Sequence, residues 1–495
     1  MRSSCFGESA NGRGPHTPPK KVWVGLATLT LSALPSLALA DHPGPLINLT
    51  EHGAGLGALV IFFLAYILAM LEESTELRKS KPMVFAASLI WVLISVIYVQ
   101  HGQGEVSGQA FRASLEGYAE LFLFILVSMT YLNAMEQRGI FDSLRIWLLS
   151  RALGYRQLFW VTGVLSFFMS SILNNLTTAL LMGAVLLAMG RDNRAFMRVA
   201  SVNVVVATNA GGSFSPFGDI TTLLVWQKGV VPFTDFFVLF LPAVMTFVIP
   251  ALIMQFFIPQ GIPEASAKAR PLPRGALGIL LLFLLTILTA VCFEKFLDLP
   301  PAAGMLTGLS YLSFYFYYLY SSRTRGQPTK IPAEPETPAP FPEDSRAFFD
   351  VFQNVARLEW DTLLFFYGVM VSVAGLSFMG YLDRVSQVLY QQLDPTWANI
   401  LVGIVSAFID NGTIMYAVLT MAPDISQGQW LLVTLTAGVG GSLLAIGSAA
   451  GVGLLGQMQG RYTFMSHLRW TPVIALGYAG GILTHFVLNA RLFPS

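Results

Sequence analysis

Long uninterrupted hydrophobic segments dominate the chain and predict membrane-spanning helices. Residues 54–71, for example, contain no charged side chain, and 18 residues form about 27 Å of helix. We expect eight uncharged spans of this kind, at 54–71, 83–99, 121–135, 236–258, 276–292, 302–320, 362–378 and 470–490. The pattern therefore predicts an all-α polytopic membrane protein.

Four further hydrophobic regions are interrupted by short polar or glycine-rich clusters. They are 158–189, interrupted at Asn174-Asn175; 199–226, interrupted over Asn209–Asp219; 397–422, interrupted at Asp410-Asn411-Gly412; and 430–456, interrupted over Gly438–Ser448. Each half of the chain contains two of them. Broken hydrophobic segments in corresponding positions of two halves are typical of a transporter binding site.

The basic residues predict which of these broken regions cross the membrane. If 158–189 and 397–422 are re-entrant hairpins and the other two regions cross, 24 of the 29 Lys and Arg residues fall on one side. No Lys or Arg lies inside a span. By the positive-inside rule this side is the cytoplasmic one. Its segments are 1–21, 72–82, 136–157, 190–198, 259–275, 321–357 and 457–469. If either hairpin crossed, every later loop would change sides and the bias would be lost.

Three motifs occur in both halves, in the same order. The matching pairs are Ser170-x-x-x-Asn174-Asn175-x-Thr177 with Ser406-x-x-x-Asp410-Asn411-x-Thr413, Gly211-Gly212-Ser213 with Gly440-Gly441-Ser442, and Glu120 and Asp142 with Asp361 and Asp383. On the hairpin topology each copy has five crossings, and an odd number turns the second copy upside down. We therefore expect two inverted-topology repeats, 54–258 and 276–491, each with three helices, a re-entrant hairpin, a discontinuous helix and a final helix.

Two segments lie outside the expected repeats. Residues 1–40 combine a basic start with an apolar run that ends at Ala38-Leu39-Ala40, the pattern of a signal peptide, and a retained first transmembrane helix is the alternative. The Pro-rich stretch 327–342 is expected to be a cytoplasmic linker.

The composition excludes several classes of protein. Only 12% of the residues are charged and 54% are hydrophobic, whereas soluble domains carry roughly 25% charged residues. A net charge of +1 without a long basic block argues against nucleic acid as a partner. The two cysteines, Cys5 and Cys292, lie far apart and no Cys/His cluster exists. We therefore expect no disulfide, no cofactor and no enzymatic activity.

The interruptions bring carboxylates and amide and hydroxyl oxygens to membrane depth. Backbone at this depth must be hydrogen-bonded within the protein or line a wet cavity, and hard cations prefer oxygen ligands. Asp219 and Asp410 lie directly in the breaks. A carboxylate in such a place can hold a proton or a metal cation but resists holding both. The acids therefore predict cation/proton exchange, and Glu120, Asp361 and His485 are candidates for a proton relay.

Other interpretations of the same residues remain open. The polar side chains could hydrogen-bond neighbouring helices, and the glycines could serve close helix packing. A Na⁺-coupled carrier of a dicarboxylate or another anion would hold the anion at helix N-termini. Asn174 fits that alternative, but Asp410 at the second hairpin tip would repel an anion. A channel is a further alternative, but paired inverted hairpins suit a transporter with alternating access better than a continuous pore.

At these motifs the sequence resembles the NhaD-type sodium/proton antiporters of the ion transporter superfamily. The resembling segments are 116–135, 170–183, 209–224, 408–419, 438–456 and 469–481. The resemblance spans roughly residues 54–491. It implies a bacterial inner-membrane carrier that works as a homodimer with elevator-like motion. Na⁺ or Li⁺ would leave as protons enter, without a cofactor besides the transported ions.

The resemblance and the breaks together define the expected site. The candidate cation- and proton-binding residues are Asp410, Asn411, Thr413, Asp219, Thr221, Thr222, Asn174, Asn175, Thr177, Asn209, Ser213, Ser442 and Ser448. Na⁺ is expected at Asp410, Asn411, Asn175 and Asp219. The family usually has an Asp-Asn pair at both hairpin tips, whereas this chain has Asn174-Asn175 at the first. Because Asn174 cannot titrate, one candidate proton carrier is missing.

Overall fold

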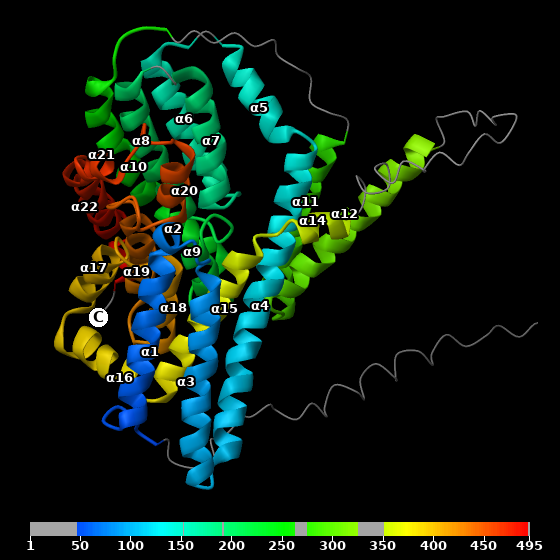
Figure 1. Cartoon of the computed structure of the whole chain (residues 1–495). Helices are drawn as coiled ribbons and strands as arrows, with labels where there is room; N and C mark the ends of the chain where they lie inside the picture. Colours follow the sequence, from blue (N-terminus) through cyan, green and yellow to red (C-terminus); the bar gives the residue numbers. More distant parts are fainter. Residues whose placement is uncertain (1–46, 152, 191–192, 263–274, 325–350, 494–495) are drawn as a thin grey trace, which may run out of the picture. The chain divides into compact units, whose positions relative to one another are not determined.

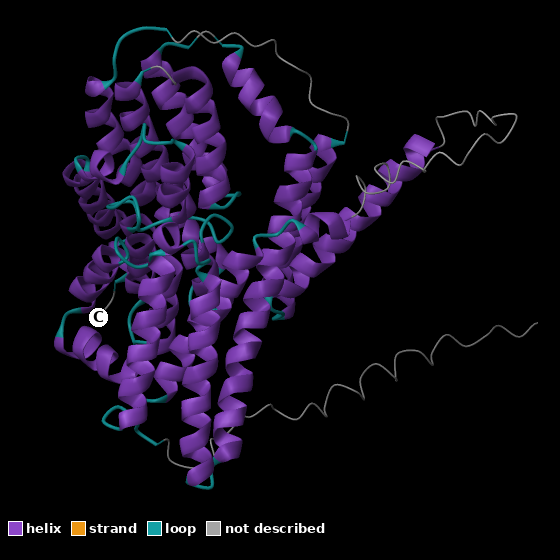
Figure 2. Cartoon of the chain, in the orientation of Figure 1, coloured by secondary structure: helices purple, strands orange, loops and turns teal. Residues whose placement is uncertain are grey.

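The computed structural model describes residues 47–151, 153–190, 193–262, 275–324 and 351–493, which belong to one compact unit (Figure 1). The described elements are helices, and no strand occurs among them (Figure 2). The predicted signal peptide or first helix (1–40) and the linker 327–342 lie outside the described residues.

Seven described helical segments are long and apolar enough to cross a membrane. They are α1 (Gly53–Met70), α3 (Ser80–Gln100), α4 (Gly104–Gln137), the run Phe233–Phe257, α11 (Ala276–Leu297), α15 (Trp360–Phe378) and α22 (Thr471–Leu488). The run Phe233–Phe257 consists of η1 (Phe233–Leu239), α10 (Phe240–Met254) and η2 (Gln255–Phe257). These segments account for seven of the eight predicted spans. The eighth forms α12 (Pro301–Thr324), which is less apolar because it contains five tyrosines. The chain is therefore a multi-pass membrane protein.

One predicted span is much longer in the structure. Helix α4 begins at Gly104 rather than at residue 121, so Arg112 and Glu116 lie on a helix and not in a loop. The charges in the first turns conceal this part of the helix from a search for uncharged residues. On the N-terminal side of its apolar part, α4 consists of helical turns with polar and charged side chains.

The four predicted interruptions are confirmed as breaks between helices. The pairs are α6 (Tyr155–Ser170) and α7 (Asn175–Gly190), α8 (Arg194–Gly212) and α9 (Ile220–Gln227), α17 (Pro395–Val405) and α18 (Asn411–Met421), and α19 (Gln427–Gly440) and α20 (Ala449–Gln457). Asp219, Asp410 and Ser448 are the N-caps of α9, α18 and α20, and each accepts a hydrogen bond from a backbone N–H in the first turn. These side chains therefore satisfy part of the backbone that the breaks expose.

Contacts between these helices come in matching pairs. Helix α7 packs against α20, and α18 packs against α9, so the second limb of each hairpin contacts the broken helix of the other half. Within the halves, α6 packs on α8 and α17 packs on α19, and across the halves α10 packs on α22. These contacts between α7 and α20 and between α18 and α9 bring all four interruptions together between the two halves. The inverted orientation of the repeats and their boundaries stay predictions.

The remaining helices surround this group. Helices α11 and α12 pack on each other and on α4, to one side of the hairpins (Figure 1). Short helical elements follow two of the long helices: α5 (Ile140–Leu149) follows α4, and α16 (Tyr381–Ser386) and the π-helical turn η3 (Gln387–Gln392) follow α15. The other short elements are α2 (Glu72–Thr75), α14 (Val351–Ala356), α21 (Phe464–Leu468) and η4 (Ala490–Leu492).

Candidate functional site

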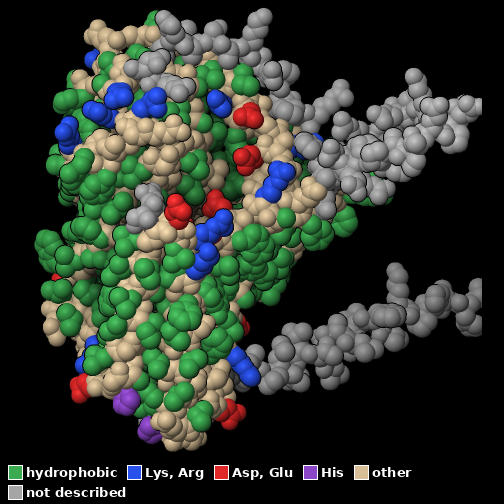
Figure 3. Space-filling view, viewed as in Figure 1, with side chains coloured by type: hydrophobic (Ala, Val, Ile, Leu, Met, Phe, Trp, Pro, Cys, Tyr) green, Lys and Arg blue, Asp and Glu red, His purple; other side chains and the backbone are tan. Residues whose placement is uncertain are grey.

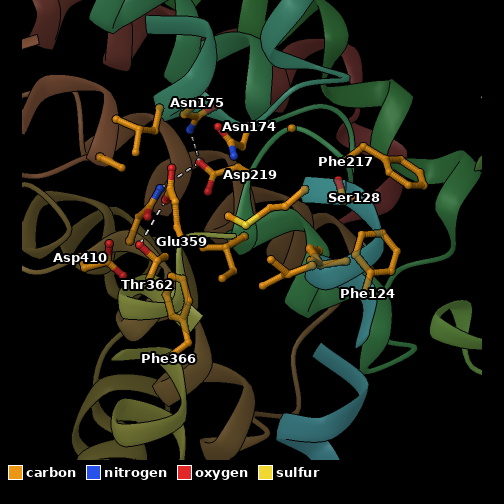
Figure 4. Close-up of a pocket in the computed structure, with 18 of the residues that line it drawn as sticks. Phe124, Ser128, Asn174, Asn175, Phe217, Asp219, Glu359, Thr362, Phe366 and Asp410 are labelled. Atoms are coloured by element: carbon orange, nitrogen blue, oxygen red, sulfur yellow. Dashed lines mark hydrogen bonds between the residues drawn. The ribbon is translucent and has the colours of Figure 1, made fainter. Parts of the chain in front are cut away.

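The carboxylate of Asp219 is the hub of a hydrogen-bond network that joins the two halves of the chain. Its Oδ2 accepts from Asn175 Nδ2 at 2.8 Å and from Asn411 Nδ2 at 2.9 Å (Figure 4). Its Oδ1 accepts from the backbone N–H of Thr221 at 3.3 Å. Asp219 thus lies between the two hairpin tips, and its partners Asn175, Asn411 and Thr221 are all residues that the sequence analysis selected as site candidates.

Asn209 extends the network from the first half to the second. Its Oδ1 accepts from Asn175 Nδ2 at 3.2 Å, and its Nδ2 donates to Ser448 Oγ at 3.0 Å. Ser170 donates to Asn175 Oδ1 at 2.5 Å and thereby fixes the orientation of that amide. Asn175, Asn209 and Ser448 are buried. The network therefore connects all four interruptions without any charged partner for Asp219.

Asp410 lies at the second hairpin tip beside this network. Its Oδ2 accepts from the backbone N–H and the hydroxyl of Thr413, at 3.2 and 3.3 Å, and its own N–H donates to Tyr66 Oη at 3.0 Å. The carboxylate is half-buried and lines the same small cavity as Asp219. The two acids that the sequence predicted therefore share one cavity.

A buried hydroxyl without a hydrogen-bond partner lies next to Asp219. It belongs to Thr221, whose Oγ1 makes no hydrogen bond in the structure. The neighbouring Gly438 has no side chain, and a Cβ atom there would lie 3.4 Å from Thr221 Oγ1 and 3.9 Å from Asp219 Oδ2. Buried polar atoms normally have a partner. An unpaired hydroxyl beside a carboxylate fits an oxygen ligand for a cation.

The other predicted site residues have structural partners around the hub. Thr222 donates to the carbonyls of Ser215 and Asp219, while Ser213 and Ser442 donate to carbonyls one turn back. Asn174 caps α7 by accepting from the N–H of Thr177 at 2.7 Å. Their role in this geometry is to stabilise the breaks, and Asn174 also lines the cavity.

Two cavities that share residues lead toward the hub. The inner cavity has a volume of about 150 Å³ and is lined by Asp219 and by both hairpin tips, Asn174-Asn175 and Asp410-Asn411. The outer cavity has a volume of about 470 Å³ and contains Glu136, Asp142, Arg145 and Arg357 in its wall. Met129, Asn174 and Glu359 line both. Figure 3 shows acidic and basic side chains around a hollow on this face.

Glu359 and Lys79 line the inner cavity, although the sequence analysis did not select them. Glu359 is the N-cap of α15 and accepts from Thr362 Oγ1 at 3.3 Å, and it projects into the cavity in Figure 4. Lys79 precedes α3 and lies 5.0 Å from the ring centre of Phe365. Glu359 precedes the uncharged span predicted at 362–378, and Lys79 lies between two predicted spans. The nearness of Glu359 to Asp361 was the available signal.

The three candidate relay residues lie elsewhere. Asp361 accepts from Ser80 Oγ at 2.5 Å, and Glu120 is half-buried on α4. His485 is fully buried and contacts the carbonyl of Gly428 and the amide of Asn489. Gly428 is at the start of α19, about 18 Å along that helix from the break. None of the three lines the inner or the outer cavity.

Comparison with known proteins identifies the family to which this protein belongs. Residues 46–438 match a family model described as citrate transporter. The chain is 50% identical to the Na⁺/H⁺ antiporter NhaD of Vibrio cholerae over 94% of its own length and 99% of that protein. It is also 50% identical to NhaD of Halomonas elongata, over 98% of the chain and 99% of the relative. The chain belongs to the NhaD antiporter family.

The NhaD relationship extends over nearly the full chain. A plant protein named sodium/proton antiporter 1, from Arabidopsis thaliana, is 27% identical over 95% of this chain and 78% of its own length. These relatives are named as transporters, not as enzymes. Among the described residues, no group of three or more His, Cys, Asp or Glu side chains could hold a resident metal ion.

Proposed function

We propose that this NhaD-family protein exchanges Na⁺ or Li⁺ for protons across the bacterial inner membrane by alternating access. The observation that carries the proposal is the position of Asp219. Its carboxylate is buried between both hairpin tips and is held by neutral amides, with no cation paired to it. A buried carboxylate in this setting needs either a proton or a bound cation.

We infer that the cation is coordinated at Asp219 and that protons compete with it there and at Asp410. Thr221 Oγ1 would add a ligand next to Asp219. The amides of Asn175 and Asn411 present their NH2 groups to Asp219 in this structure, and rotation of either amide would bring a further oxygen ligand to the cation. Because one carboxylate cannot hold both ions, release of Na⁺ and uptake of H⁺ are linked. Asn174 cannot take up a proton, so two acids remain for this task.

The cavities suggest which side is open. The outer cavity includes Arg145 and Arg357, and both belong to segments predicted to be cytoplasmic. We propose that the structure is the inward-open state, in which cytoplasmic Na⁺ reaches the hub past Glu359. The outward-open state would form when the hairpin helices move relative to α4, α11 and α12, which we expect to belong to the interface of a homodimer.

The exchange is tested with the purified protein in lipid vesicles that carry an acidic interior. Adding NaCl or LiCl should collapse the pH gradient, and KCl should not. The half-saturating Na⁺ concentration should rise as the pH falls, because protons occupy the same carboxylates. No response to Na⁺ or Li⁺ between about pH 7 and 9.5 would disprove the proposal, since both acids are ionisable over that range.

Replacing Gly438 by Ala should raise the half-saturating Na⁺ concentration without destabilising the protein. The new methyl group would lie at ordinary contact distance from Thr221 Oγ1 and Asp219 Oδ2 and would fill the space beside the proposed ligands. Alanine also stabilises helix interiors relative to glycine by about 0.5–1 kcal/mol. Gly456→Ala, in α20 with nothing within 4 Å, is the matched control and should leave the Na⁺ response unchanged.

A Na⁺-coupled carboxylate carrier is the second candidate, favoured by the citrate transporter model and by Lys79 in the cavity wall. Against it, Asp219, Asp410 and Glu359 line the same cavity. Its volume of about 150 Å³ is also small, since pockets for organic ligands usually have roughly 300 Å³ or more. Na⁺-stimulated uptake of labelled citrate into the same vesicles would decide for this carrier.

A further inference from the structure

A third cavity, of about 480 Å³, lies outside the proposed transport pathway. It is bounded by the first turns of α8, the end of the α10 segment and the junction of α21 and α22. Arg198, Arg469 and Trp470 line it together with Phe257 and Ile253. It shares no lining residue with the two cavities at the hub. We call it the α8–α22 pocket.

The two arginines of the α8–α22 pocket are exposed and have no acidic partner. In the part of the chain that the structure describes, the single ion pair joins Arg384 and Glu51, far from both in sequence. Helices α8 and α22 also have no acid in their first turns. Helix N-termini attract negative charge and usually carry acids. Arginines in these places leave a positive potential that an anion would offset.

Exposed apolar side chains line the same pocket or directly adjoin its lining residues in the chain. Phe256 and Phe257 are 75% and 62% exposed, and Met465 of α21 is 65% exposed. The ring of Trp470 packs edge-on against Phe257, with 5.1 Å between the ring centres. Lys and Arg side chains gather at the upper left of Figure 3, where Figure 1 shows α8 and α21. Tryptophan beside basic groups and exposed apolar surface is typical of the membrane–water interface.

We propose that the α8–α22 pocket binds the headgroup phosphate of an anionic phospholipid. Both guanidinium groups would donate to phosphate oxygens, for which their planar geometry is well suited. The acyl chains would lie over Phe256 and Met465. A basic pocket between helices on the cytoplasmic side is the arrangement that recognises anionic lipid headgroups. The apolar border distinguishes this ligand from a free phosphate ion, which would gain nothing from it.

Bound lipid would stabilise the helices that form the transport site. Helix α8 contains both Arg198 of the pocket and Asn209 of the hub. On the other wall, His467 of α21 contacts the carbonyl of Ser442 in the second glycine-rich break, with 2.8 Å between Nε2 and the oxygen. A ligand that clamps α8 to the α21–α22 junction binds only the folded protein, and its binding therefore raises the unfolding temperature.

The test is thermal unfolding of the detergent-purified full chain with added dioleoylphosphatidylglycerol, dioleoylphosphatidylcholine or inorganic phosphate. Only the phosphatidylglycerol should raise the unfolding temperature of the wild type. In Arg198→Gln/Arg469→Gln, its apparent affinity should fall by about tenfold or more, because charge-assisted hydrogen bonds are lost. Arg198→Lys/Arg469→Lys should retain part of the effect. Arg491 is an exposed arginine near the C-terminus that does not line the pocket, and Arg491→Gln should behave as wild type.

Three outcomes would overturn the proposal. One is an equal stabilisation by phosphatidylcholine, which would show that the headgroup charge is not recognised. Another is full stabilisation by inorganic phosphate alone, which would assign the pocket to a free anion. The third is an unchanged phosphatidylglycerol affinity in the double glutamine variant. Because unfolding is measured without an ion gradient, each result is independent of whether the protein exchanges Na⁺ for H⁺.

Discussion

Replacing Asp219 by Asn should reduce Na⁺/H⁺ exchange to the background of empty vesicles. The variant keeps the size of the side chain but removes the charge at the hub. Two opposite charges about 4 Å apart attract each other by about 4 kcal/mol at an effective dielectric constant of about 20. Losing that attraction corresponds to about a thousandfold weaker cation binding. Initial rates of pH-gradient collapse at saturating and at low NaCl measure the effect.

The control for Asp219→Asn must separate the loss of charge from general damage. Asp383 has an exposed carboxylate and lines neither the inner nor the outer cavity. Asp383→Asn should therefore retain the wild-type exchange rate. The unfolding temperature of Asp219→Asn should stay close to that of the wild type or exceed it, because an unpaired buried charge has been removed. Substantial exchange by a folded Asp219→Asn variant would exclude Asp219 as the cation ligand.

Asp410→Asn should abolish proton-coupled exchange as well, while the second hairpin stays folded. Asn is as good an N-cap as Asp, so α18 keeps its first-turn hydrogen bond while the titratable group is lost. Na⁺-driven pH changes should vanish at every pH. Asp410→Glu keeps a carboxylate and should retain a measurable part of the rate.

The matched control for Asp410→Asn is Asp394→Asn. Asp394 caps α17, the first limb of the same hairpin, and accepts from Thr396 N–H at 2.8 Å, but it is exposed and lies outside both cavities. It should leave exchange unchanged. If Asp410→Asn retained full exchange, the proton would have to be carried by another group, and Glu359 would be the next candidate because it lines both cavities.

Local chemistry explains why so much of the fold could be predicted. A span is an uninterrupted apolar helix, and a break is a place where Gly, Asn, Asp or Ser exposes or caps the backbone, so both are properties of adjacent residues. The breaks at Asn174-Asn175 and at Asp410-Asn411 were found for this reason. The same criterion does not predict the start of α4, because its N-terminal turns are helical but carry charged side chains.

The sequence alone determined the membrane spans, the four breaks and the two acids inside them, because each follows from neighbouring residues. Only the tertiary structure decided which polar groups meet. Asn411 reaches Asp219 across 192 positions, and Asn209 reaches Ser448 across 239. The same holds for Glu359, which lines the cavity, whereas Asp361, two residues on, contacts Ser80 instead. Glu359 is the N-cap of α15 and Asp361 lies in its first turn, so their side chains leave the helix in different directions, and the packing of α15 against its neighbours selects between them.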